Sequence, residues 1–137
     1  MEINEAIINI IHGDPYTLPK MPIVDKLYDQ ISMKGIEKGI ACYDSLKSNE
    51  FQNYDFSESQ LNFLGYRLLN DKKAKEAIEI FRLNTIAFPQ SSNAFDSLGE
   101  AYYHAGDIPT AIKCYQKALE LDPTNLSSIS MLKKLKS

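Results

Sequence analysis

The sequence predicts an all-α protein built from repeated helical hairpins, because it repeats itself every 34 residues. The same residue types recur at this spacing in five places: Leu64 and Leu98, Gly65 and Gly99, Ala77 and Ala111, Phe81 and Tyr115, and Pro89 and Pro123. Within each repeat, apolar residues recur at helical spacing, and pairs such as Gly106-Asp107 and Asp122-Pro123 interrupt the pattern. A period of this length indicates an array of one supersecondary unit, here two antiparallel helices.

Residues 1–21 differ from the repeats. Residues 2–11 are apolar on more than one face of a short helix, and three prolines fall in the stretch HGDPYTLPKMP, residues 12–22. Because proline fixes its own backbone and restricts the residue before it, we expect an extended strap there. A short helix that is apolar nearly all round needs a partner. We expect it to dock on its own array or, as the favoured outcome, on a second copy to form a homodimer. The predicted docking residues are Ile3, Ile7, Ile10, Ile11, Tyr16 and Leu18.

The rest of the chain divides into three hairpins and a last helix. Residues 22–50 predict a degenerate hairpin, because IEKGIACYDSLK (36–47) parallels IPTAIKCYQKAL (108–119). Repeats follow at 58–91 and 92–125, and a capping helix at 126–137 carries apolar residues on one face and lysines on the other.

Local signals set the helix ends. Ser57 and Gln60 predict a capping box that opens a helix at 58–70, and a second helix is expected at 74–87. Asp107 is a good N-cap, and Pro109 falls in a first turn where its missing N–H costs nothing. The small residues Gly99 and Ala111 let two helices cross closely.

The composition excludes several functions. The chain has 137 residues, 44% of them hydrophobic and 24% charged, with a net charge of −3. No basic stripe suits nucleic acid, and no apolar run is long enough to span a membrane. Glu2 and Glu5 stand where a signal peptide would be basic, so we expect the chain as written to be cytoplasmic.

Few residues suggest chemistry. Cys42 and Cys114 lack the paired spacing of a zinc site, so no metal or cofactor is expected, and two separate helical thiols are favoured over a disulfide. Ser130 and Lys133 satisfy an S-x-x-K pattern, but its companion motifs S-D-N and K-T-G are missing. The sequence therefore predicts no catalytic residue and no enzyme.

The repeat residues resemble the tetratricopeptide repeat, which implies a right-handed α-α superhelix that binds proteins. The second unit matches the family pattern at eight positions: Phe95, Leu98, Gly99, Tyr102, Ala111, Tyr115, Ala118 and Pro123. In this family the first helix of each unit lines a concave groove. The resemblance places these residues there: Ser59, Asn62, Tyr66, Leu69, Asn70, Asn93, Asp96, Glu100, Tyr103 and His104.

The charges of these positions bear on the ligand. Asp96, Glu100 and His104 share one helix face, which could orient an imidazole or hold a metal ion loosely, but a solvated or groove-lining face is favoured. The two carboxylates would repel the acidic chaperone tails that some family members bind, so a neutral or basic peptide fits better.

A longer pattern suggests a role. The stretch from AIINIIHGDPYTLPK to NAFDSLGEAYYHAGD resembles the C-terminal extension of bacterial serine hydrolases of the β-lactamase and penicillin-binding type. This resemblance implies a non-catalytic accessory module whose hydrolase domain is absent from the chain, and an extracytoplasmic location if the parent is secreted. The alternative is a free-standing adaptor that binds a neutral or basic peptide in its groove.

Overall fold

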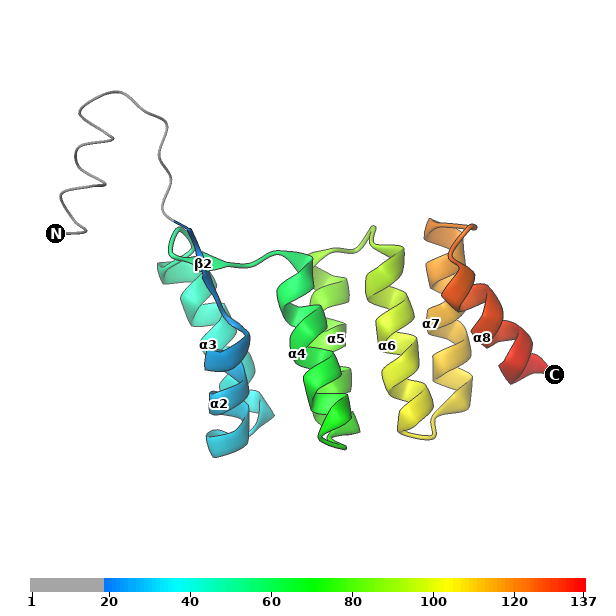
Figure 1. The fold of residues 1–137 in the computed structure, drawn as a ribbon, viewed down its shortest axis with the longest axis horizontal. Helices are drawn as coiled ribbons and strands as arrows, with labels where there is room; N and C mark the ends of the chain where they lie inside the picture. Colours follow the sequence, from blue (N-terminus) through cyan, green and yellow to red (C-terminus); the bar gives the residue numbers. More distant parts are fainter. Residues whose placement is uncertain (1–18) are drawn as a thin grey trace, which may run out of the picture.

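A computed structural model describes residues 19–137, and in this part of the chain helices pack side by side in one row (Figure 1). Two short strands, β1 (Met21–Pro22) and β2 (Tyr54–Asp55), lie near its N-terminal end. The helices are α2 (Val24–Lys34), α3 (Ile36–Asn49), α4 (Glu58–Asn70), α5 (Ala74–Ala87), α6 (Ser92–His104), α7 (Ile108–Leu121) and α8 (Leu126–Lys136). The all-α prediction is confirmed for these residues.

The helices of the first repeat and the last helix lie where the sequence predicts them. The bounds of α4 and α5 are those expected for the first repeat, and α8 is the expected last helix. The Asp107 carboxylate accepts a hydrogen bond from the Thr110 N–H at 3.2 Å, and a proline occupies the first turn of α7. Before that cap, Gly106 has a φ of +87°, a conformation that costs a residue without Cβ very little.

Gly99 lies at a close helix crossing, as expected, and Gly65 occupies the equivalent place in the first repeat. A Cβ added to Gly65 would lie 2.3 Å from the Phe81 ring, and one added to Gly99 would lie 3.0 Å from the Tyr115 ring. Both rings are buried at the centre of their hairpins. The same glycine–ring contact therefore packs each of the two repeats, α4 on α5 and α6 on α7.

The junction between the first hairpin and the first repeat is built differently from the next one. Eight residues, 50–57, join α3 to α4, whereas four residues, 88–91, join α5 to α6. Within the longer linker, β2 pairs in parallel with β1, with Met21 opposite Tyr54.

The capping box predicted at Ser57 and Gln60 is wrong. The Ser57 side chain makes no capping hydrogen bond, and Gln60 instead accepts a hydrogen bond from the Ile23 N–H at 3.1 Å and donates one to Asp55 at 3.3 Å. Ile23 is fully buried, so its N–H needs a partner inside the protein. Gln60 thus connects α4 to the start of α2 instead of closing its own helix.

The N-terminal predictions fall almost entirely outside the described residues. The expected helix at 2–11 and the docking residues Ile3, Ile7, Ile10, Ile11, Tyr16 and Leu18 are not among residues 19–137. Of the expected strap, only residues 19–22 are described, and there Met21 and Pro22 form the short strand β1.

Four features bear on function classes. Among residues 19–137, no helix is long and apolar enough to cross a membrane, and no group of three metal-ligating side chains comes together. Cys42 and Cys114 are free thiols, the first half-buried and the second buried. Ser130 and Lys133 are both exposed on α8, so no cleft surrounds the S-x-x-K pattern.

Candidate peptide-binding face

The ten residues predicted to line a groove lie on α4 and α6, the first helices of the two repeats. These two helices are in contact, so the structure brings both sets onto neighbouring helices. We refer to the α4 and α6 positions together as the α4–α6 face. Six of their side chains form three groups: a polar network between the helices, one buried carboxylate, and an exposed cluster at the C-terminal end of α6.

The polar network joins α4 to α6 through one serine. The Ser97 hydroxyl donates to the Asn62 side-chain oxygen at 2.8 Å and lies 3.1 Å from the Tyr66 hydroxyl. The Tyr66 hydroxyl in turn donates to a Glu100 carboxylate oxygen at 3.0 Å. Three of the predicted residues are therefore held in place by neighbours and not free to rotate.

Ser97 is the residue that the sequence analysis missed. It is buried and lies one position after Asp96, outside the family's groove positions. Only one feature of the sequence could have indicated this role. Position 97 carries a small hydroxyl side chain, not a large apolar one, on the helix face turned toward the preceding repeat.

Asp96 was predicted to line the groove and to repel an acidic ligand, but its carboxylate is buried. Its exposed fraction is 6%, because α8 covers it. The Ser128 hydroxyl donates to one of its oxygens at 2.7 Å, and the Ser127 hydroxyl donates to the other at 3.2 Å. Since a buried carboxylate requires such donors, Asp96 joins α6 to α8 and presents little charge to a ligand.

The exposed cluster lies at the C-terminal end of α6. His104 Nε2 lies 3.8 Å from the second oxygen of Glu100, and about half of the His104 side chain is exposed. The Tyr103 ring packs edge-on against His104, and the Lys134 ammonium lies 5.0 Å from the centre of that ring. An aromatic ring, a carboxylate and two basic groups are thus available to a ligand at this end.

The remaining predicted residues lie toward the helix starts or outside the network. The Asn93 amide and the Ser91 hydroxyl both donate to Glu58, at 3.4 and 2.7 Å. Ser59 and Asn70 are exposed, and Leu69 packs against the core.

Burial changes the acidity of one network member. Desolvation raises the pKa of the Tyr66 phenol to about 12, against an opposing effect of its contact with Ser97. The phenol therefore keeps its proton at neutral pH, and that proton is the one donated to Glu100.

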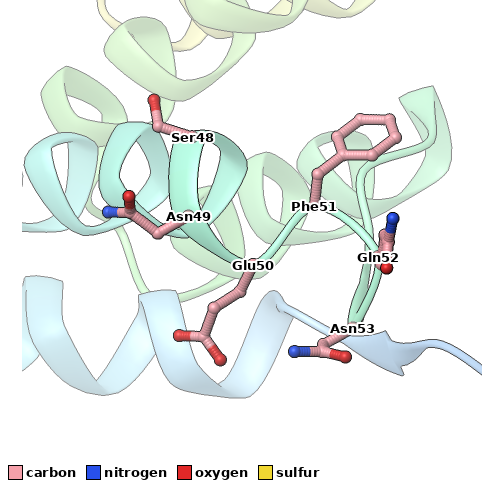
Figure 2. Close-up of a pocket in the computed structure, with 6 residues that line it drawn as sticks. All are labelled: Ser48, Asn49, Glu50, Phe51, Gln52 and Asn53. Atoms are coloured by element: carbon pink, nitrogen blue, oxygen red, sulfur yellow. The ribbon is translucent and has the colours of Figure 1, made fainter.

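Two pockets in the described residues lie away from the α4–α6 face. One, of about 370 Å³, is lined only by residues 48–53 at the turn that follows α3, and it is mostly polar. Figure 2 shows the Phe51 ring on the opposite side of this turn from Glu50. Because a single turn forms it, this pocket offers no converging groups from several elements.

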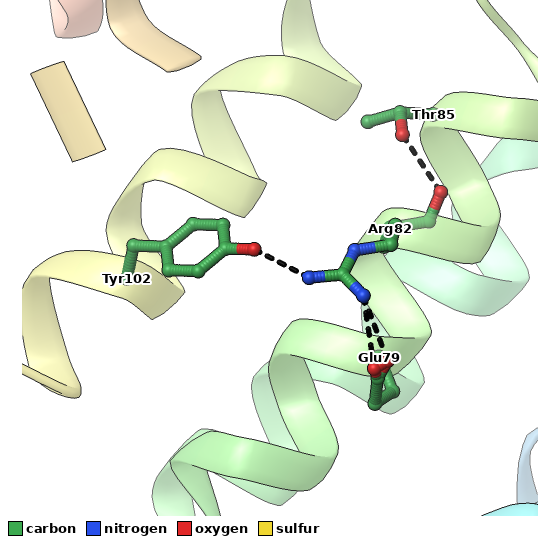
Figure 3. A network of polar contacts seen from close by, with 4 residues as sticks. All are labelled: Glu79, Arg82, Thr85 and Tyr102. Carbon is green, nitrogen blue, oxygen red and sulfur yellow. Dashed lines mark hydrogen bonds and ion pairs between the residues drawn. The ribbon is translucent and has the colours of Figure 1, made fainter. Parts of the chain in front are cut away.

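A second polar network also connects the repeats, between α5 and α6. One Arg82 nitrogen donates to the Tyr102 hydroxyl at 2.6 Å, and another donates to both Glu79 oxygens at 3.1 and 3.2 Å (Figure 3). About half of the Arg82 side chain is exposed, so the network is a surface feature.

The comparisons with known proteins agree on the fold class. The described chain superposes on the first TPR domain of Spaghetti (RPAP3) bound to an HSP90 peptide, with a TM-score of 0.58 and 18% identity over 83% of this chain and 87% of that one. It also superposes on the Sgt2 TPR domain from Aspergillus fumigatus, with a TM-score of 0.58 and 22% identity over 89% and 82%. The protein therefore has the TPR-like helical repeat fold, as predicted.

Sequence comparisons also find tetratricopeptide-repeat proteins. The family model described as tetratricopeptide repeat matches residues 97–125. Tetratricopeptide repeat protein 37 of Xenopus laevis is 40% identical over 50 residues, and Superkiller protein 3 of Schizosaccharomyces pombe is 29% identical over 104 residues. These stretches are 36% and 74% of this chain, which spans only 3% and 7% of the two relatives. Both are eukaryotic proteins, and the resemblance to a bacterial hydrolase extension finds no support in these matches.

Proposed function

We propose that this chain is a non-catalytic adaptor domain that binds an extended peptide segment of a partner protein across the α4–α6 face. The fold supports a binding role, since an array of hairpins presents one helix of each repeat side by side. The neighbours named above include a domain solved with a bound peptide, SRMEEVD, and another TPR domain of RPAP3 is described in complex with SGPTIEEVD.

The charge of the face favours a neutral or basic peptide over such acidic ones. The ten positions hold no Lys or Arg, and Glu100 is the carboxylate among them that reaches solvent, with 39% of its side chain exposed. This charge distribution is the single observation from which we infer a neutral or basic peptide as the ligand. The Tyr103 ring beside it, which the Lys134 ammonium already approaches at 5.0 Å, offers a surface for an apolar side chain.

The network between Asn62 and Glu100 supports the same role mechanically. Because Tyr66 and Ser97 hold Glu100 in one position, a ligand that pairs with Glu100 meets an ordered carboxylate. Pre-ordering of this kind lowers the entropy cost of binding.

A peptide panel tests the proposal. Fluorescence anisotropy would compare labelled peptides that carry Lys or Arg beside an apolar anchor with the acidic peptides SRMEEVD and SGPTIEEVD. We expect the basic peptides to bind at micromolar or weaker affinity and more weakly as salt is raised. Glu100→Gln should weaken them by severalfold, whereas Glu120→Gln, an exposed glutamate on α7, should have no effect.

Tight binding of SRMEEVD, with no effect of Glu100→Gln on any peptide, would contradict the charge argument. Absence of binding by every peptide of both classes would contradict the adaptor function itself.

A further inference from the structure

The first helices of the hairpins form a row that extends beyond the α4–α6 face. The helices α2, α4, α6 and α8 begin at Val24, Glu58, Ser92 and Leu126, so each begins 34 residues after the one before it. Contacts join α2 to α4 and α4 to α6, and hydrogen bonds join α6 to α8. A peptide that lies across the α4–α6 face can therefore extend onto α2.

The α2–α4 contact exposes an aromatic ring at a position where the α4–α6 contact buries a hydroxyl. Phe63 lies 34 residues before Ser97, so the two residues occupy the same position in their repeats. Ser97 is buried, and its hydroxyl reaches Asn62 on the preceding first helix. Phe63 is 62% exposed. By the same register, Phe63 lies on the side of α4 that is turned toward α2.

Phe63 also shares a helix face with the predicted groove positions of α4. Ser59 lies four residues before it, and Tyr66 and Asn70 lie three and seven residues after it. Residues at these spacings lie on one face of an α-helix. Ser59 and Asn70 are exposed, so the Phe63 ring is open to a ligand on the same side of the row as the α4–α6 face.

The other exposed large apolar side chains in the described part of the chain lie elsewhere. They are Met21, Met33, Phe51, Ile86 and Leu126, and none of them is on α4 or α6. Phe51, the other phenylalanine among them, stacks on Phe56 and lines the second pocket, of about 440 Å³, beside the 50–57 linker. Phe63 is therefore the exposed large apolar residue that a ligand on the α4–α6 face would meet.

The charged side chains of the α2–α4 contact balance one another. One Arg67 nitrogen donates to Asp25 at 2.8 Å, and the Arg67 guanidinium lies 3.8 Å from the centre of the Tyr28 ring. The Tyr28 hydroxyl donates to Asp71, and the Lys73 ammonium lies 5.8 Å from the centre of the same ring. Two basic groups thus accompany two carboxylates, so this contact suits an apolar ligand group better than a charged one.

We propose that Phe63 binds the apolar side chain of the partner peptide, and that the peptide crosses the α2–α4 contact as well as the α4–α6 face. This inference rests on the proposed peptide-binding function and names the residue that selects the apolar anchor. Covering the ring removes apolar surface from water, which favours association. The peptide thus pairs a basic residue with Glu100 and places an apolar residue on Phe63.

The geometry of the row sets the spacing of these two peptide residues. Packed helices lie about 8–10 Å apart, and Phe63 precedes Tyr66, which is bonded to Glu100, by about 4.5 Å along the helix axis. The Cα atoms of Phe63 and Glu100 are therefore about 10 Å apart, and an extended peptide covers about 10–14 Å in three or four residues. We expect the apolar residue of the ligand to lie three or four positions from its Lys or Arg.

A fluorescence experiment on the full chain tests whether a peptide covers position 63. The sequence contains no Trp, so Phe63→Trp introduces a single reporter. In the free protein we expect its emission to lie close to that of the chain unfolded in urea. A peptide without Trp, with leucine three or four positions from lysine, should shift the emission to the blue. Ile86→Trp is the matched control, because Ile86 is 70% exposed on α5, a second helix, and its emission should not change.

Binding measurements then locate the anchor. Phe63→Ala and replacement of the peptide leucine by alanine should each weaken binding severalfold, and together little more than either alone. The Glu100→Gln effect should add to that of the peptide change, since the two concern different peptide residues. A peptide with leucine adjacent to lysine should bind severalfold more weakly than one with the wider spacing.

Several outcomes would overturn the inference, and they separate it from the proposed function. If Glu100→Gln weakens binding but Phe63→Ala does not, the peptide face stands and the anchor is wrong. If the peptide leucine is coupled to Tyr103→Ala instead of Phe63→Ala, the anchor lies at the end of α6. Absence of binding by every peptide removes the adaptor function and this inference with it.

The emission of the free Phe63→Trp chain tests two other occupants of this position. A blue-shifted emission that moves to the red on dilution, with a fall in mass by light scattering, would show that a second copy covers position 63. A blue-shifted emission at every concentration would show that the chain itself covers it. Either result would contradict a free ring that binds the peptide.

Discussion

The two glycines at equivalent repeat positions should respond differently to the same substitution. A Cβ at Gly65 would lie 2.3, 2.4 and 2.7 Å from three atoms of the Phe81 ring, which is fully buried. Carbon atoms prefer separations of about 3.5–4.0 Å, so this ring would have to move by about 1 Å. At Gly99 the corresponding contacts with Tyr115 are 3.0, 3.1 and 3.2 Å, which need a shift of only a few tenths of an ångström.

The magnitudes follow from two opposing effects. Overpacking a core costs about 1–3 kcal/mol, and replacing Gly by Ala inside a helix returns about 1 kcal/mol. The contact at Gly65 is severe, so its overpacking cost should lie at the upper end of this range, at about 3 kcal/mol. After the gain of about 1 kcal/mol from helix propensity, Gly65→Ala should lower the free energy of unfolding by about 2 kcal/mol. Gly99→Ala should change it by less than about 1 kcal/mol, because the two effects nearly cancel. For a chain of this size the first change corresponds to a fall in Tm of roughly 6–10 °C.

Urea unfolding followed by far-ultraviolet circular dichroism measures both variants against the parent. Phe81→Leu supplies a further check, since removing the ring should cost less in the Gly65→Ala background than in the parent. If Gly65→Ala and Gly99→Ala are equally stable, the close helix crossing inferred at Gly65 is wrong.

Three further changes probe the polar contacts. Asp96→Ala should lower the free energy of unfolding by about 1–3 kcal/mol, because it leaves the buried Ser128 hydroxyl without an acceptor. Hydrogen exchange in α8 should also become faster. Unchanged exchange would contradict this contact. The free energy of unfolding should fall as the pH rises from 10.0 to about 12, since the folded Tyr66 phenol, with its pKa raised to about 12, keeps a proton that the unfolded chain loses. Urea titrations across this pH range should show a smaller fall for Tyr66→Phe. Arg82→Met should change the free energy of unfolding by only about 0–1 kcal/mol, because its contacts with Glu79 and Tyr102 are partly exposed. A loss well above about 1 kcal/mol in the same urea assay would show that this network stabilises the fold more than its exposure suggests.

The sequence by itself determined the helices and their pairing within each repeat. The 34-residue period, the cap at Asp107 and the small residues Gly99 and Ala111 are signals between neighbours in the chain or in one hairpin. Such signals act over a few turns of helix, so they can be read without knowing how the hairpins meet. The ends of α4, α5 and α8 agree with them.

The tertiary structure decided which polar side chains remain exposed and which form hydrogen bonds with other elements. Asp96 occupies a groove position by register, but α8, more than thirty residues later, places Ser128 on it and buries it. Gln60 satisfies a capping pattern, yet its side-chain oxygen accepts a hydrogen bond from the buried Ile23 N–H, 37 residues earlier. In both cases a buried polar group needed a partner from another element, and desolvation outweighs a local preference when the two compete. The first junction also depends on contacts between distant segments, because β2 of the 50–57 linker pairs with β1, more than thirty residues earlier in the chain.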